Sequence, residues 1–93
     1  MDERTEVRTD AAPRGTGAYS QAIRAGDFVF ISGQGPLDPS TLEVVGTTVE
    51  EQTEATLRNL ETIVRAAGGS LGNIVKVSAF LSSIDAVLYL PER

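Results

Sequence analysis

The spacing of apolar side chains changes along the chain and divides it into elements. Residues 49–67 carry apolar positions at helical intervals. The stripe consists of Thr53, Thr56, Leu57, Leu60, Ile63, Val64 and Ala67. Thr48 and Glu51 have the spacing of a capping box, and Gly68 follows as a left-handed cap. The pattern therefore predicts one amphipathic helix over residues 49–67.

The remaining apolar runs have the length and composition of strands. Residues 6–9 predict a short first strand, and residues 19–33 predict two strands around a tight turn at Ala25, Gly26 and Asp27. Residues 28–31 are continuously apolar, which predicts a strand covered on both faces. Residues 74–81 alternate, which predicts a strand with one apolar face. The order strand-strand-strand-helix-strand indicates an α+β fold in which the helix packs on a sheet.

Length and composition are those of one globular unit. The chain has 93 residues, so we expect a single domain over residues 1–93. Hydrophobic residues make up 41% and charged residues 23%, which is typical of a folded protein. The charged first ten residues lack the apolar core of a signal peptide, and no apolar run approaches membrane-spanning length. We therefore expect a cytoplasmic protein that does not contact a membrane.

Charge and missing residue types narrow the chemistry. The formal net charge is -5 with 8 basic residues, which argues against a nucleic-acid partner. The chain has no Cys and no His, which excludes disulfides, thiolate nucleophiles and Ser-His pairs. Zinc sites of the usual kind are excluded for the same reason. We expect no metal and no cofactor.

Residues 30–39, FISGQGPLDP, end an apolar strand in a glycine-rich turn. A phosphate-binding loop would continue into a helix, but Pro36 and Asp38 follow instead, so that mechanism is disfavoured. The Ser32 hydroxyl can bind a small ligand, although position alone favours a strand-end serine that caps loop amides. Tyr19 can wall a pocket or can be a core aromatic with a hydrated hydroxyl. Asp38 is predicted to form the turn before Pro39.

Four segments taken together carry a family resemblance. They are GAYSQAI (17–23), FISGQGPLDP (30–39), EQTEATLRNLETIVRAAGGSL (51–71) and IVKVSAFL (74–81). In this order and spacing they resemble the Rid, or YjgF, family of reactive-intermediate (enamine/imine) deaminases. The match covers residues 10–85, and residues 86–93 diverge.

The resemblance implies a fold and an assembly. The fold is like that of the AroH-type chorismate mutase, in which a mixed β-sheet packs on helices. The assembly is a homotrimer that binds small carboxylate-bearing substrates in clefts between subunits. The implied reaction is hydrolysis of 2-aminoacrylate-type enamines, or their imines, to 2-oxoacids and ammonia. An imine carbon is already electrophilic, so positioning and electrostatics can suffice without a covalent nucleophile.

The resemblance also suggests the site and marks where this chain departs from the family. By matching position, Tyr19 and Ser32 line the substrate pocket, with Gly33 and Gln34 of the same turn beside them. After residue 85 the chain lacks the family's second helix and last two strands, so the fold is expected to be C-terminally truncated. The family's substrate-clamping arginine and water-orienting glutamate match no position here, and the catalytic residues are unknown. The alternative is a non-catalytic trimeric small-ligand-binding protein of the same family.

Overall fold

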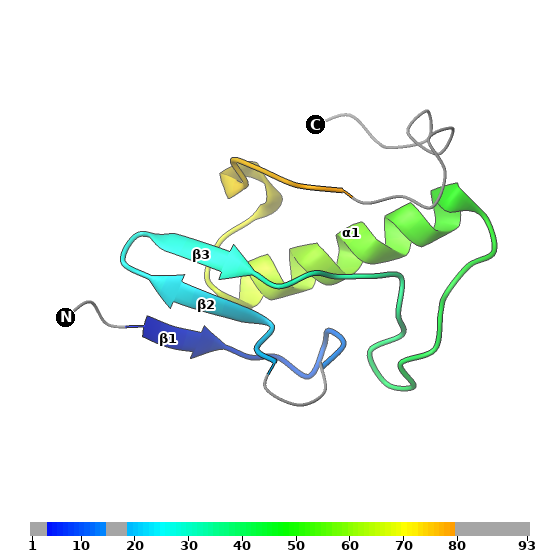
Figure 1. Ribbon diagram of the computed structural model, residues 1–93, viewed down its shortest axis with the longest axis horizontal. Helices are drawn as coiled ribbons and strands as arrows, with labels where there is room; N and C mark the ends of the chain where they lie inside the picture. The colour runs from blue at the N-terminus through cyan, green and yellow to red at the C-terminus, as the bar shows by residue number, and fades with distance from the viewer. Residues whose placement is uncertain (1–3, 15–18, 80–93) are drawn as a thin grey trace.

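A three-stranded antiparallel sheet and one α-helix form the protein, as a computed structural model describes for residues 4–14 and 19–79 (Figure 1). The elements are β1 (Arg4–Val7), β2 (Ala22–Ala25), β3 (Phe28–Ile31), α1 (Val49–Ala66) and the 3-10 helix η1 (Leu71–Asn73). The strand order is β1-β2-β3. The predicted order is therefore confirmed from the first strand through the helix. All strand pairs among the described residues are antiparallel, and the parallel pairing of a mixed sheet is not among them.

The β2–β3 hairpin follows the turn chemistry of the sequence. Ala25 pairs with Phe28, so Gly26 and Asp27 form a two-residue loop. Gly26 has a φ of 60°, and a positive φ at the first loop position is what a type II′ hairpin turn requires. The predicted turn is confirmed.

The first strand lies two residues earlier than predicted, at Arg4–Val7 instead of residues 6–9. Thr9 cannot continue the ladder because both of its backbone groups bond to the Gln21 side chain. The Thr9 amide donates to Gln21 Oε1 at 2.8 Å, and Gln21 Nε2 donates to the Thr9 carbonyl at 3.0 Å. A side-chain contact from a distant residue ends this strand.

Helix α1 begins and ends as the sequence predicts. The Thr48 side chain accepts from the Glu51 amide in a capping box, and Gly68 follows with a φ of 93°. The buried side is narrower than the predicted stripe, because only Ile63 and Val64 of that stripe are buried. Ala55 and Asn59 are the other buried positions of the helix, and the sequence pattern did not identify them.

The two faces of the sheet differ in cover. On one face Val29 and Ile31 pack against a core cluster that includes Ala22 and Ile63. On the opposite face Phe28 and Phe30 are 63% and 64% exposed. The prediction that residues 28–31 are covered on both faces is therefore wrong for this chain, because its one described α-helix covers one face only.

The last predicted strand does not form in the described part of the segment. Residues 74–79 have no strand assignment, and residues 80 and 81 lie outside the described residues. Val75 is 88% and Val77 51% exposed, so the alternating apolar pattern finds no covering layer. An extended segment also needs a neighbouring strand for its backbone groups. Residues 15–18 and residues 86–93, which are expected from the sequence to diverge from the family, likewise lie outside the described residues.

Candidate functional site

The turn after β3 meets the segment before β2 at one end of the sheet. The Ser32 amide donates to the Gln21 carbonyl at 3.0 Å, which extends the β2–β3 pairing by one step. The Ser32 hydroxyl donates to the Ser20 carbonyl. Its bond is thus to a carbonyl and not to the loop amides expected of a capping serine. A hydroxyl that donates one bond keeps oxygen lone pairs that can accept another.

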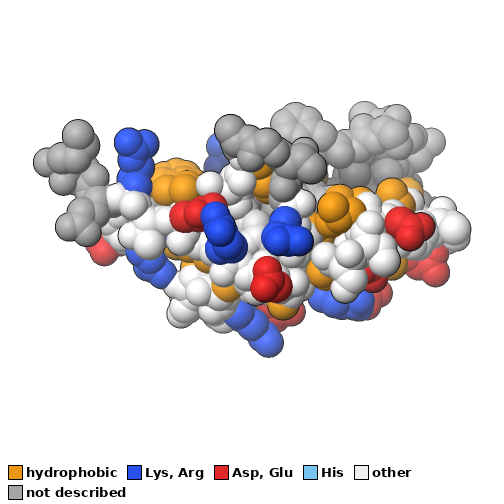
Figure 2. Space-filling view, turned by 90° about the horizontal axis from the view of Figure 1, so that it is seen from below, with side chains coloured by type: hydrophobic (Ala, Val, Ile, Leu, Met, Phe, Trp, Pro, Cys, Tyr) orange, Lys and Arg blue, Asp and Glu red, His pale blue; other side chains and the backbone are white. Residues whose placement is uncertain are grey.

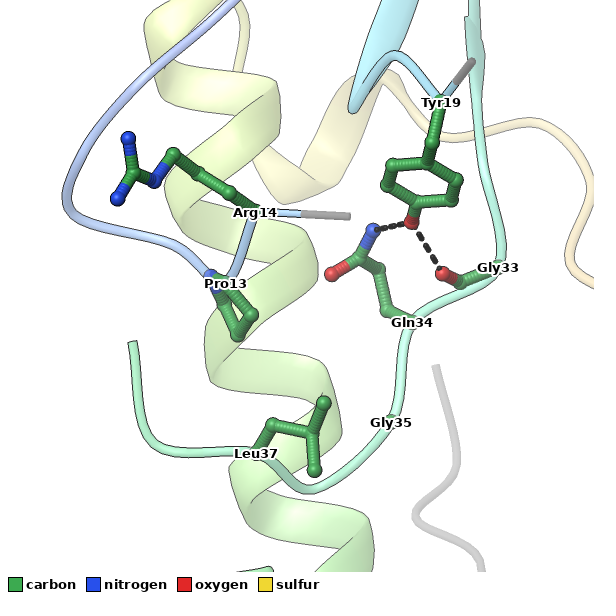
Figure 3. Close-up of a pocket in the computed structure, with 7 residues that line it drawn as sticks. All are labelled: Pro13, Arg14, Tyr19, Gly33, Gln34, Gly35 and Leu37. Atoms are coloured by element: carbon green, nitrogen blue, oxygen red, sulfur yellow. Dashed lines mark hydrogen bonds between the residues drawn. The ribbon is translucent and has the colours of Figure 1, made fainter. Parts of the chain in front are cut away.

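Tyr19, Gly33 and Gln34 form a connected cluster beside Ser32 (Figure 3). The Tyr19 hydroxyl donates to the Gly33 carbonyl at 2.8 Å and accepts from Gln34 Nε2 at 3.1 Å. Gln34 Nε2 also donates to the Ser32 carbonyl at 3.2 Å. Tyr19 is 37% exposed, so it is not a core aromatic. The structure therefore brings the four residues named from the sequence together.

A pocket of about 260 Å³ opens at this cluster. The described residues that line it are Pro13, Arg14, Tyr19, Gly33, Gln34, Gly35 and Leu37, and we call it the Tyr19 pocket. Pro13 and Arg14 form one wall, and the turn after β3 forms the other (Figure 3). Ser32, which directly precedes Gly33, is not among the lining residues. The size suits a small organic molecule and not a dinucleotide.

Arg14 is a pocket residue that the sequence reasoning missed. It is the one charged side chain among the described residues that line the Tyr19 pocket. Figure 3 shows its guanidinium turned away from Tyr19 and Gln34, so it would reach a bound anion by changing rotamer. Arg14 is exposed, and exposed side chains change rotamer within nanoseconds. The sequence signal that could have identified Arg14 was its position in the segment that precedes Tyr19.

Asp38 lies in the loop that follows the pocket residues, and its carboxylate bonds to backbone amides of that loop. Its carboxylate accepts from the Ser40 and Thr41 amides at 2.8 and 3.0 Å. The Thr41 amide first, and the Ser40 amide second, lower the pKa of Asp38 below its ordinary value of 3.8. The predicted turn-forming role is confirmed, and an acid held in its charged form here is a poor proton donor near neutral pH.

A second, larger cavity of about 1550 Å³ lies beside β3 and α1. Its wall includes Phe28 and Phe30 of β3, Leu57 and Leu60 of α1, and Val75 of the following segment. We call it the β3–α1 hollow. It shares Gly33, Gln34 and Gly35 with the Tyr19 pocket, and Ser32 also lines it. Four of the large apolar side chains that the described chain leaves exposed border this hollow: Phe28, Phe30, Val75 and Val77.

A metal site, a membrane span and a basic patch each have structural requirements that can be compared with the described surface. Residues 4–14 and 19–79 hold no group of three or more His, Cys, Asp or Glu side chains placed to bind a metal ion. Within the same ranges no helix is long and apolar enough to cross a membrane. On the face shown in Figure 2, basic and acidic side chains are interspersed, so positive charge does not gather there.

The fold and this cluster define an α+β protein with a small pocket at the end of a hairpin. The model of the family described as Endoribonuclease L-PSP matches residues 9–90, and the chain belongs to this family. Rid and RutC family proteins are among the relatives that match this chain, so its resemblance to the Rid/YjgF family is confirmed.

Individual relatives agree with this assignment. A RutC family protein of Pyrococcus horikoshii is 46% identical over 79 residues, which are 85% of this chain and 63% of that protein. The chloroplastic Reactive Intermediate Deaminase A of Arabidopsis thaliana is 41% identical over 84% of this chain and 42% of its own length. A solved Thermotoga maritima structure, described as a candidate endoribonuclease, matches with a TM-score of 0.88 at 47% identity over 91% of this chain and 67% of that one. The YjgF-like fold is thereby confirmed. The chain spans less than two thirds of these two curated relatives.

Proposed function

We propose that the protein hydrolyses small enamines or imines of the 2-aminoacrylate type to 2-oxoacids and ammonia. The observation that carries this proposal is the Tyr19–Gly33–Gln34 hydrogen-bonded cluster in a small pocket beside an arginine. The 41% identity to a protein named Reactive Intermediate Deaminase A supports the same reaction class.

The pocket has groups for both ends of such a substrate. Arg14 supplies the positive charge for the substrate carboxylate. The amide oxygen of Gln34, which points towards the Arg14 wall in Figure 3, accepts from the imine nitrogen. Held in this way, the electrophilic carbon needs one positioned water and no covalent enzyme intermediate. In the proposed assembly, a homotrimer, the pocket lies in a cleft between subunits.

The alternative is a non-catalytic protein that binds the same kind of small carboxylate. One observation favours it: no described residue that lines the Tyr19 pocket is a carboxylate that could orient water. RNA hydrolysis ranks below both, because the chain has no histidine and a formal net charge of -5.

A coupled assay separates the two candidates. A dehydratase generates 2-iminobutyrate from threonine in situ, and semicarbazide traps the imine that is not hydrolysed. We expect this protein to accelerate 2-oxobutyrate release at the expense of the trapped product. Arg14→Ala should lower kcat/KM by about 10- to 100-fold, mainly through KM, since a hydrogen bond to a charged group contributes about 1.5–3 kcal/mol.

Arg58→Ala is the matched control, because Arg58 is an exposed arginine that pairs with Glu54 on α1. It should leave the kinetics unchanged. No acceleration at any protein concentration would rule out catalysis. Binding of 2-oxobutyrate without acceleration would establish the alternative.

A further inference from the structure

The two walls of the Tyr19 pocket are each held by one buried carboxamide side chain. Gln21 is 4% and Asn59 5% exposed, and these are the buried polar side chains among the described residues. Both use their amide groups on backbone atoms of the pocket loops and not on each other.

Gln21 holds the wall that contains Pro13 and Arg14. Its Nε2 donates to the Ala12 carbonyl at 3.1 Å and to the Pro13 carbonyl at 3.0 Å. Its Oε1 accepts from the Thr9 amide at 2.8 Å. Ala12 is fully buried and Pro13 is buried, so their carbonyls need a donor from the protein itself. Gln21 therefore fixes the residue that precedes Arg14.

Asn59 holds the opposite wall. Its Nδ2 donates to the Gly35 and Leu37 carbonyls, each at 3.0 Å, and both residues line the pocket. Gly35 directly follows Gln34, so this contact also sets where the Gln34 amide meets Tyr19. Gly35 lies outside every strand of the described sheet, and the bridge between Leu37 and Val44 holds the loop only to itself. Asn59 is therefore the side chain that ties this wall to α1.

The two anchors stand on elements that share one core. Gln21 directly precedes Ala22 of β2, and Asn59 is one turn before Ile63 of α1. Ala22 and Ile63 are both 0% exposed and belong to the same cluster. Both anchors therefore stand on one packed core, and each is joined to its own pocket loop by hydrogen bonds from a single side chain.

We propose that Gln21 and Asn59 are positioning residues of the Tyr19 pocket, which set the separation of the Arg14 wall from the Tyr19–Gln34 cluster. Neither touches the ligand. As a statement about a ligand site the inference rests on the proposed function, but its structural part is testable without any ligand.

The test uses Gln21→Glu and Asn59→Asp, which keep side-chain shape and replace the N–H donors by oxygen. Ile63→Val is the matched control, because it loosens the shared core without touching either loop. The first readout is the ring signal of Tyr19 in ¹³C-tyrosine NMR, assigned with Tyr19→Phe. The second is the affinity for 2-oxobutyrate by titration. If either variant does not fold, the serine variant at the same position, Gln21→Ser or Asn59→Ser, whose side chain is too short for these bonds, replaces it.

We expect Gln21→Glu and Asn59→Asp to shift the Tyr19 signal and to weaken 2-oxobutyrate binding at least tenfold. Acidification, which protonates the introduced carboxyl and restores one donor, should recover part of the affinity. Ile63→Val should lower the melting temperature and leave both readouts unchanged. A Tyr19 signal that responds no more than in Ile63→Val overturns the inference. A wild type that neither binds nor hydrolyses overturns the proposed function instead, and the Tyr19 signal still decides the positioning role.

Discussion

The Tyr19 pocket and the β3–α1 hollow share Gly33, Gln34 and Gly35 but differ in what closes them. Hydrogen bonds between described residues build the pocket, whose volume is about 260 Å³. Apolar side chains of β3 and α1 border the hollow, whose volume is about 1550 Å³. A polar cluster with internal partners can stand by itself in water. An apolar surface of this kind contributes to stability only when further protein covers it.

This difference suggests different roles for the two regions: ligand binding for the Tyr19 pocket and subunit association for the β3–α1 hollow. The small pocket has the scale and chemistry of a ligand site. The hollow has Phe28 and Phe30 on its border, both more than half exposed. It therefore supports the proposed oligomer and not a second ligand site. Variants of the shared core, of the hollow and of the helix start distinguish these two roles.

The largest effect is expected at Ile63 of the core cluster, on the helix that also carries Asn59. It is fully buried in the core cluster with Val7, Ala12 and Ala22. Ile63→Ala should lower the free energy of unfolding by about 2–5 kcal/mol, because it leaves a cavity between helix and sheet. Urea unfolding followed by circular dichroism measures it. A loss below about 1 kcal/mol, the size of a surface effect, would mean that helix and sheet are not joined through this residue.

Local sequence signals predicted the parts of the fold that depend on neighbours in the chain. The capping box at Thr48 and Glu51 and the turn at Gly26 involve residues at most a few positions apart, and both are confirmed. The final strand depends on partners elsewhere, and its apolar alternation alone did not produce pairing in residues 74–79. A periodic pattern specifies which face is apolar but not what covers it.

The site was predictable only in part for the same reason. The segment resemblance identified Tyr19, Ser32, Gly33 and Gln34, and the hydrogen bonds bring them together. Asn59 was not identified, since an asparagine in an amphipathic helix is ordinarily a surface residue. Its partners are 22 and 24 positions away. Arg14 was missed because its wall is placed by a contact between segments 8 to 12 positions apart.

The second-largest effect is expected for substitutions in the β3–α1 hollow. Replacing Phe28 and Phe30 together by Thr keeps the β-propensity of β3 and removes its exposed aromatic surface. We expect the association constant of the oligomer to fall roughly tenfold or more, a change of about 1.4 kcal/mol per tenfold.

Light scattering over a dilution series measures this change, and 2-oxobutyrate titration at a fixed oligomer fraction is its control. An unchanged association constant would remove the hollow from the interface. A wild type that is monomeric and well folded at all concentrations would contradict the proposed assembly.

The smallest effect is expected at the start of α1. A change there tests whether the Tyr19 pocket and the β3–α1 hollow respond to the helix separately. The Glu51 carboxylate accepts from the Thr47 and Thr48 amides at 2.9 and 3.2 Å. The Thr47 amide first, then Thr48, lower the pKa of Glu51 below its ordinary value of 4.5. The folded state therefore favours the charged form. This stabilisation is complete above pH 4.5 and is lost as the pH falls through the lower folded-state value.

Glu51→Gln should thus be less stable than the wild type near neutral pH, and the difference in melting temperature should shrink on acidification below pH 4.5. Glu50→Gln, which removes a charge from the same helical turn, is the control for the helix dipole alone. Val49 and Gln52 of this first turn border the hollow, whereas Asn59 contacts the pocket residues about two turns later. Fraying of the first turn should therefore leave the Tyr19 NMR signal in place. A Tyr19 signal that moves with the cap would show that the pocket and the hollow respond to the helix as one unit.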